Sequence, residues 1–281
     1  MKTGKIEEIR IEEIEEMETD TMSKLEKVFD TPNKKAFIGF LTAGDPDADS
    51  TVQFILEMEK AGADLIEIGI PFSDPTAEGV VIQEANIRSL SNGMTTDGVF
   101  EIVQRVREQS EIPLAFMTYV NPVFHYGYEK FFTKCEELGI SAIIIPDVPY
   151  EEKAEVEAPA KAHGVKVISM IAPTSESRIR QIASEAEGFI YVVSSMGVTG
   201  VRSEIKTDLP AIVESIRTVT DVPCAIGFGI STPEQAKAMA YISDGAIVGS
   251  AIVKIIAKYG KDAAPYIGEY VKSMKEAVAE A

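Results

Sequence analysis

Short, nearly continuous apolar runs recur along the chain from residue 36 to residue 250. The runs are rich in Val and Ile, the composition of strands that are buried on both faces of a parallel sheet. Eight such runs are present, at 36–43, 64–70, 113–119, 141–146, 165–172, 188–195, 222–229 and 245–250.

Between the runs the pattern changes to the period of amphipathic helices, as at 50–63, 128–140 and 177–188. Several of these stretches end in Gly, a signal for a helix C-terminus. Eight successive strand–helix units predict an α/β fold, a (β/α)8 TIM barrel in a single domain. The alternative is an open doubly wound sheet, which is disfavoured because no GxGxxG motif follows the first strand.

The N-terminal stretch 1–21 differs from the rest of the chain. It holds seven Glu, one Asp and three Lys or Arg, a net charge of −5, with only a weak apolar stripe. We expect an acidic extension over 1–21, partly helical or disordered, with a docking helix as the alternative. The barrel domain then spans 22–281, and Met22 is an alternative start.

Composition narrows the class of protein. The formal net charge is −18, whereas a nucleic-acid binder needs a basic footprint. No apolar stretch reaches the roughly 18 residues of a membrane helix, and no apolar segment near the N-terminus suggests a secretory signal. Cys135 and Cys224 lack CxxC spacing and the chain has two His, which argues against a zinc site or a disulfide framework. We therefore expect a cytoplasmic protein that binds no metal, nucleic acid or membrane.

In such barrels the active site lies at the carboxyl ends of the strands. Polar residues at the predicted strand ends include Asp45, Tyr119, Asn121 and Asp147. The last three runs end in glycine-rich loops, and Ser231 and Ser250 stand where helices are expected to begin. Backbone N–H groups at a helix N-terminus bind phosphate without Lys or Arg, so we predict a phosphate site here rather than simple turns.

Glu67 interrupts the second apolar run. Burial of a carboxyl group raises its pKa and suits it to acid–base catalysis near neutral pH. The alternative is a structural Glu paired with a strand-end Tyr or a backbone N–H. Asp74 and Glu78 follow in a loop, where acids are usually only solvated, although a second acid could hold a ring N–H of a substrate.

Several longer motifs, in order over about residues 24–280, closely resemble the tryptophan synthase alpha subunit family. They are "FLTAGDP" (40–46), "GADLIEIGIPFSDP" (62–75), "MTYVNPVF" (117–124), "PDVP" (146–149), "GVTG" (197–200), "GFGIS" (227–231) and "GSAIVKII" (249–256).

The resemblance implies a TIM-barrel lyase. It would cleave indole-3-glycerol phosphate to indole and glyceraldehyde 3-phosphate by a retro-aldol reaction. The indole would pass to a beta subunit, in an expected α2β2 tetramer. The chain itself would use no cofactor, because the pyridoxal phosphate belongs to the beta partner.

The resemblance also implies roles for particular residues. Glu67 would be the general acid/base, Glu78 would hold the indole N–H, and Tyr191 would lie near Glu67. The substrate-binding residues would be Phe40, Met117, Tyr119, Ile144, Thr199, Gly200, Phe228, Gly229, Gly249 and Ser250. The partner interface would include Pro71, Asp74, Asp147 and Pro149.

One loop departs from the family pattern. The common "DPLADGP" is "DPTAEGV" here, so that Glu78 replaces Asp and Val80 replaces Pro. A misplacement of about 1 Å can lower the rate on the order of 10²-fold, so we expect these replacements to change catalytic efficiency more than the type of reaction.

Three alternatives stay open. The chain could be a stand-alone indole-releasing lyase, or a weakened barrel that binds and activates the beta subunit. It could also be another sugar-phosphate barrel enzyme, although those usually have His or Lys among their strand-end catalysts.

Overall fold

The structure is a computed structural model that describes residues 23–31, 34–194, 208–227 and 229–281. Its strands form a single parallel sheet in the order β5-β4-β3-β2-β1-β9-β8-β7-β6. The strands are β1 (Ala36–Thr42), β2 (Leu65–Gly69), β3 (Leu114–Met117), β4 (Ala142–Ile144), β5 (Lys166–Val167), β6 (Ser169–Ile171), β7 (Ile190–Val193), β8 (Cys224–Gly227) and β9 (Gly245–Val248).

The sheet closes on itself. Strand β1 pairs in parallel with β2 on one side and with β9 on the other. The two ends of the order, β5 and β6, are separated in sequence only by Ile168, whose N–H donates to Ile143 O at 2.9 Å. The predicted (β/α)8 barrel is therefore confirmed and the doubly wound alternative is wrong. Each of the eight apolar runs contains a barrel strand, and the fifth is divided into β5 and β6.

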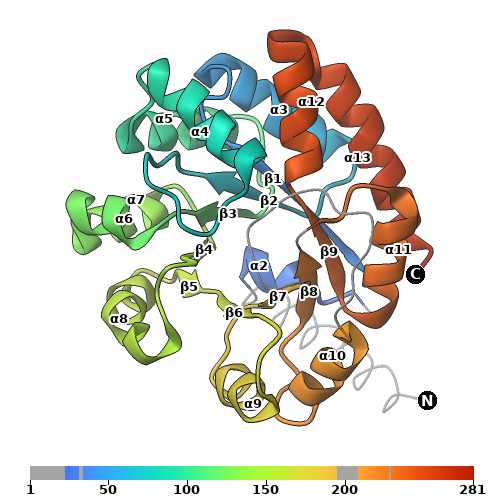
Figure 1. The fold of residues 1–281 in the computed structure, drawn as a ribbon. Helices are drawn as coiled ribbons and strands as arrows, with labels where there is room; N and C mark the ends of the chain where they lie inside the picture. Colours follow the sequence, from blue (N-terminus) through green and yellow to red (C-terminus); the bar gives the residue numbers. More distant parts are fainter. Residues whose placement is uncertain (1–22, 32–33, 195–207, 228) are drawn as a thin grey trace, which may run out of the picture.

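Helices surround the ring of strands (Figure 1). The α-helices are α2 (Lys24–Lys27), α3 (Ala48–Lys60), α4 (Val80–Ser91), α5 (Thr96–Arg107), α6 (Val120–Tyr126), α7 (Tyr128–Glu137), α8 (Ala154–Ala162), α9 (Glu176–Ser184), α10 (Leu209–Arg217), α11 (Pro233–Ile242), α12 (Ser250–Tyr259) and α13 (Ala264–Ala279). The short 3-10 helices are η1 (Tyr150–Glu152) and η2 (Gly260–Ala263).

Alternation along the strands divides the buried residues between two layers. In β2, Ile66 and Ile68 belong to the cluster between the sheet and the helices, whereas Leu65 belongs to the cluster inside the barrel. Because successive strand residues point to opposite faces, Glu67 is directed inward with Leu65.

Helix α2 covers one end of the barrel and lies near the centre of the ring in Figure 1. Leu25 and Val28 are buried in the inner cluster, and the Phe29 ring lies 5.7 Å from the Phe189 ring, centroid to centroid. Ser23 caps the helix through a capping box with Glu26.

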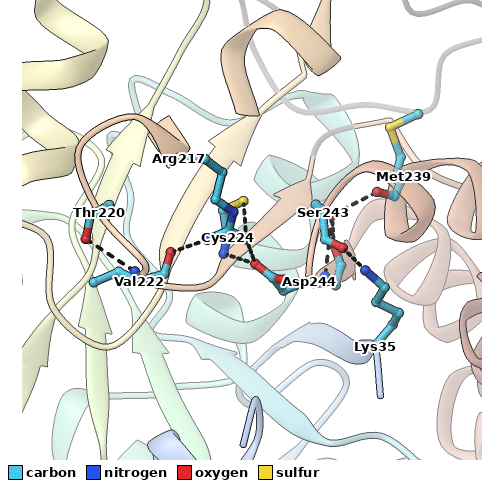
Figure 2. A network of polar contacts seen from close by, with 9 residues as sticks. Lys35, Arg217, Thr220, Val222, Cys224, Met239, Ser243 and Asp244 are labelled. Carbon is cyan, nitrogen blue, oxygen red and sulfur yellow. Dashed lines mark hydrogen bonds and ion pairs between the residues drawn. The ribbon is translucent and has the colours of Figure 1, made fainter. Parts of the chain in front are cut away.

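A polar network joins the beginnings of β8 and β9 (Figure 2). The Cys224 N–H donates to Asp244 Oδ2 at 2.7 Å, and Arg217 forms an ion pair with the same carboxylate. Lys35 Nζ donates to Ser243 O at 2.6 Å, so the residue before β1 is tied to the same corner. These contacts fix strand ends opposite to those at which chemistry is expected.

Among the residues that the structure describes, no helix is both long enough and apolar enough to cross a membrane. The predicted extension over 1–21 lies outside the described residues.

Candidate active site

A pocket lies at the carboxyl ends of the strands, where the sequence predicted the chemistry. Its wall is mainly apolar, with two carboxyl groups. The lining residues are Phe40, Glu67, Ala77, Glu78, Ile82, Met117, Pro146, Met170, Tyr191, Gly229, Ile230, Ile247, Gly249 and Ser250.

Glu67 is completely buried in the pocket wall. Neither of its carboxyl oxygens has a hydrogen-bond partner among the described residues. Burial therefore raises the pKa of Glu67 to about 8. A buried polar group without a hydrogen-bond partner lowers the stability of the fold, so a catalytic role explains this carboxyl group better than a structural role does. The structural alternative, a Glu paired with a Tyr or a backbone N–H, finds no such pair in the described part of the chain.

Tyr191 lies beside Glu67. Burial, and then the nearby Glu67 carboxylate, hold the pKa of its hydroxyl well above the ordinary value. The ring is accommodated by Gly227 on the neighbouring strand, where a Cβ atom would come within 2.4 Å of the Tyr191 hydroxyl oxygen.

Glu78 is the second acid in the pocket wall, on the loop between β2 and α4. Burial raises the pKa of Glu78 to about 7, and a hydrogen bond from Asn86 opposes this rise. Asn86 Nδ2 donates to Glu78 Oε2 at 2.7 Å, and Gln83 Nε2 donates to the Glu78 carbonyl oxygen at 2.7 Å. The structure thus places both predicted acids in one pocket.

The loop that carries Glu78 is held at two further points. Tyr119 is buried, and its hydroxyl oxygen accepts the Ala77 N–H at 3.0 Å. Burial, and then the charge of Glu78, raise the pKa of the Tyr119 hydroxyl. Tyr119 and Ile144 were both expected to line the substrate pocket, but neither is part of its wall. Tyr119 holds the loop, and Ile144 lies in the inner core.

Phe40 and Met117 do line the pocket, as expected. Two glycines leave room for the Phe40 ring. A Cβ atom at Gly69 would lie 2.7 Å from Phe40 Cζ, and one at Gly249 would lie 3.1 Å from Phe40 Cδ1.

Helix α12 begins at the pocket. Gly249 precedes the helix and Ser250 begins it, and no side chain in the described part of the chain caps its N-terminus. Both residues line the pocket, together with Gly229, whose φ of +87° suits glycine. These three predicted phosphate-binding residues are therefore brought together. Thr199, Gly200 and Phe228 lie outside the described residues.

Ser231 differs from the expectation. Helix α11 begins at Pro233 and is capped by Thr232, and the Ser231 N–H donates to Gln235 Oε1 at 2.8 Å. The N–H is already used within the protein, so Ser231 is not a free donor for an anion.

The residues expected at a partner interface lie around the same rim but differ in exposure. Asp74 and Pro149 are exposed, whereas Pro71 is buried. Asp147 is exposed as well, and its Oδ1 accepts the Val120 N–H at the beginning of α6, 3.0 Å away.

Helix α4 is fastened to the loop after β1. Arg88 donates to both carboxylate oxygens of Asp45, with Nε 2.8 Å from Oδ1 and Nη2 2.7 Å from Oδ2. Ser89 Oγ donates to Ala43 O at 2.6 Å. Asp45, a strand-end acid in the sequence, is 1% exposed and anchors this helix instead of lining the pocket.

Sequence reasoning missed several residues of the site. Most are apolar wall residues that resemble ordinary core positions in sequence, namely Ala77, Ile82, Pro146, Met170, Ile230 and Ile247. Asn86 carried a usable signal. It lies on the buried face of α4 with Ile82, Ala85 and Ser89, and a buried Asn in a helix needs a partner.

Within the described ranges, no group of three or more His, Cys, Asp or Glu side chains could hold a metal ion.

Comparison with known proteins agrees with this geometry. The family profile described as tryptophan synthase alpha chain matches residues 27–279. A tryptophan synthase alpha chain from Lacticaseibacillus casei is 48% identical over 257 residues, covering 92% of this chain and 96% of the relative. One from Lactiplantibacillus plantarum is 47% identical over 258 residues, covering 92% of this chain and 97% of the relative.

Solved structures give the same result. The crystal structure of a tryptophan synthase alpha chain from Legionella pneumophila has a TM-score of 0.83 at 34% identity, covering 92% of this chain and 98% of that one. A chain of the tryptophan synthase α2β2 complex from Pyrococcus furiosus has a TM-score of 0.79 at 34% identity, covering 86% and 98%. The family match, the curated relatives and the pocket agree, and the chain belongs to the tryptophan synthase alpha chain family.

Proposed function

We propose that this chain is the lyase half of a tryptophan synthase and cleaves indole-3-glycerol phosphate to indole and glyceraldehyde 3-phosphate. One observation carries the proposal. Glu67 presents a buried carboxyl group without a hydrogen-bond partner among the described residues, in an apolar pocket that also contains Glu78.

The pKa of about 8 keeps Glu67 largely protonated at neutral pH. Glu67 donates this proton to C3 of the indole ring, and Glu78 accepts the ring N–H and stabilises the positive charge that develops. The resulting Glu67 carboxylate then takes the proton of the glycerol hydroxyl next to the scissile bond. As that hydroxyl becomes the aldehyde, the C–C bond breaks, and its electron pair returns to the ring as indole leaves.

The remaining pocket residues bind the two ends of the substrate. Phe40 and Met117 form apolar walls for the flat ring. The N-terminus of α12, with Gly249 and Ser250, binds the phosphate through backbone N–H groups, and Gly229 allows close approach from the facing loop. A site built from backbone dipoles suits a chain with a net charge of −18. Thr199, Gly200 and Phe228 are proposed to complete the substrate site, and Tyr191 to form its wall beside Glu67.

The partner is a tryptophan synthase beta subunit, which carries the pyridoxal phosphate, in an α2β2 tetramer. It would cover the rim of the pocket at Asp74, Asp147 and Pro149, with Pro71 shaping the loop from within. We place the enzyme in the cytoplasm, with the acidic extension at 1–21 outside the barrel domain.

The test is indole release from indole-3-glycerol phosphate by the purified chain, alone and with a beta subunit. Slow release that rises strongly with the beta subunit supports the proposal. Fast release by the chain alone supports a free-standing lyase. No release in either condition, with activation of the beta subunit retained, supports an activating barrel and overturns the proposal.

A further inference from the structure

Glu78 is one methylene longer than the Asp that is common at this position in the family. Two hydrogen bonds nevertheless hold this residue in place. Its carbonyl oxygen is bound by Gln83 Nε2 and its Oε2 by Asn86 Nδ2, each at 2.7 Å. No hydrogen bond to the other carboxylate oxygen, Oε1, is found among the described residues, although Glu78 is part of the pocket wall.

Asn86 is itself well fixed. It is 4% exposed and lies on the buried face of α4. The next turn of the helix is fastened to the loop after β1 by the Arg88–Asp45 pair and by Ser89. The Asn86 amide is therefore carried by a helix that is anchored independently of the Glu78 loop.

We propose that Asn86 is a positioning residue for the second acid: its amide occupies Glu78 Oε2 so that Oε1 is left to accept the indole N–H. This inference rests on the proposed function. It explains how the longer side chain keeps a defined direction, because one oxygen is fixed and the other is presented to the pocket.

The Asn86–Glu78 hydrogen bond also affects the ionisation of the Glu78 carboxyl group. Among the residues that the structure describes, the titratable groups near Glu78 are Glu67 and Tyr191 in the pocket wall and the Tyr119 hydroxyl, and none of these three is a cation. A neutral amide donor favours the ionised carboxylate without introducing a positive charge that would repel the developing indole cation. Loss of the Asn86 donor should therefore raise the pKa of Glu78 further, in the direction that burial alone produces.

The experiment compares the wild-type chain with Asn86→Leu, which keeps the branched shape of the side chain and removes the donor. Each is assayed with a beta subunit across the range from about pH 6 to about pH 9. If the pKa of Glu78 rises by about one unit, we expect kcat/KM of Asn86→Leu to fall about 10-fold at about pH 6 and about 5-fold at about pH 7. At the alkaline end kcat/KM should recover to within about 3-fold of the wild-type value, because the carboxyl group of Glu78 is then ionised in both proteins. A uniform loss at every pH, or no loss, would overturn the inference.

Two variants sharpen the result. In a Glu78→Gln background, Asn86→Leu should have less than about a threefold further effect, because both changes act on one carboxylate. Ile87→Ala, in the next helix position with a side chain 63% exposed, should leave the pH profile unchanged. Independent effects of the two substitutions at 78 and 86 would contradict the positioning role.

A carbon-13 NMR titration of the Glu carboxyl groups separates this inference from the proposed function, because it needs no turnover. The Glu78 resonance is assigned by its absence in Glu78→Gln. If the wild-type chain releases no indole, the proposed function fails, and the titration still shows whether Asn86→Leu raises the pKa of Glu78. An unchanged Glu78 titration in Asn86→Leu overturns the inference even if the enzyme is active.

Discussion

Tyr191 occupies the space that a side chain at Gly227 would need. A Cβ atom on Gly227 would lie 2.4 Å from the Tyr191 hydroxyl oxygen and 2.7 Å from Cε1 and Cζ of the ring. These atoms belong to a buried ring beside Glu67, so the pair links the backbone of β8 to the acid of β2.

Gly227→Ala should therefore displace Tyr191 and disturb Glu67. We expect kcat/KM for indole release to fall by at least about 10-fold and the free energy of unfolding to fall by about 1–3 kcal/mol, the usual cost of overpacking. Steady-state kinetics and urea denaturation measure the two effects. Gly164→Ala is the control, because a Cβ atom there meets nothing within 4 Å, and its positive φ of +70° costs only local strain. Wild-type turnover in Gly227→Ala would show that Tyr191 does not position the site.

Glu67→Gln removes the proton donor and keeps the shape. We expect indole release to fall by on the order of 10³-fold or more, because both proton transfers are assigned to this one group. Binding of a substrate analogue, measured by calorimetry, should change by less than about threefold. Near-normal turnover in this variant would contradict the assignment of Glu67.

The same substitution predicts a change in the pH dependence of stability. The pKa of Glu67 rises from 4.5 to about 8 on folding, so the native state holds this proton more tightly than the unfolded state does. Stability from this group is complete below about pH 4.5 and is lost as pH rises toward about 8. Between about pH 5 and about pH 8 the wild-type chain should lose roughly 3–5 kcal/mol relative to Glu67→Gln. Parallel unfolding free energies for the two proteins over this range would show that Glu67 is not desolvated.

The Arg88–Asp45 pair should respond unequally to loss of either partner. The Asp45 side chain is 1% exposed and that of Arg88 is 34% exposed. Arg88→Met leaves the buried Asp45 carboxylate without its two hydrogen-bond donors and should lower the free energy of unfolding by about 3–5 kcal/mol. Asp45→Asn leaves a guanidinium group that reaches water and should lower it by about 1–2 kcal/mol. Chemical denaturation measures both. Arg180→Ala, at an exposed i,i+4 pair with Glu176, should cost under about 0.5 kcal/mol. Equal losses of unfolding free energy in Asp45→Asn and Arg88→Met would contradict the role assigned to the difference in burial.

The phosphate site can be tested with a misplaced charge. Ser250→Asp puts a carboxylate at the start of α12, where a phosphate would otherwise lie. We expect KM for indole-3-glycerol phosphate to rise about 10- to 100-fold with kcat changed far less. Thr95→Asp introduces the same charge at the N-cap of α5, away from the pocket, and should leave KM unchanged because Asp is also a good cap. An unaltered KM in Ser250→Asp would place the phosphate elsewhere.

The barrel could be predicted because its signal is local. Each apolar run reports a strand buried on both faces, and the period-two alternation alone directs Glu67 inward. The interruption at Ile168 left no trace in the apolar pattern, because a short break in pairing does not require a polar residue.

Contacts between elements were harder to predict. Asn86 is eight residues from Glu78 and Arg88 is 43 residues from Asp45, and both meetings depend on the tilt of α4 against β1. The hydrophobic pattern fixes which face of a helix is buried but not its tilt. The family resemblance places Tyr119 in the pocket wall, whereas in the structure its hydroxyl group holds the Glu78 loop. The helix expected at Ser231 begins at Pro233 instead, and the Ser231 N–H donates to Gln235.

Helix α2, with Leu25 and Val28 in the inner core, gives the barrel a floor. Because α2 closes this end of the barrel, substrate and product can enter and leave the pocket only at the carboxyl ends of the strands. For this chain the rim is also where the proposed partner sits, so the partner's position decides whether released indole reaches a second catalyst or diffuses into bulk water. Retention of indole is then a property of the assembled complex, and neither this chain nor the proposed partner has that property alone.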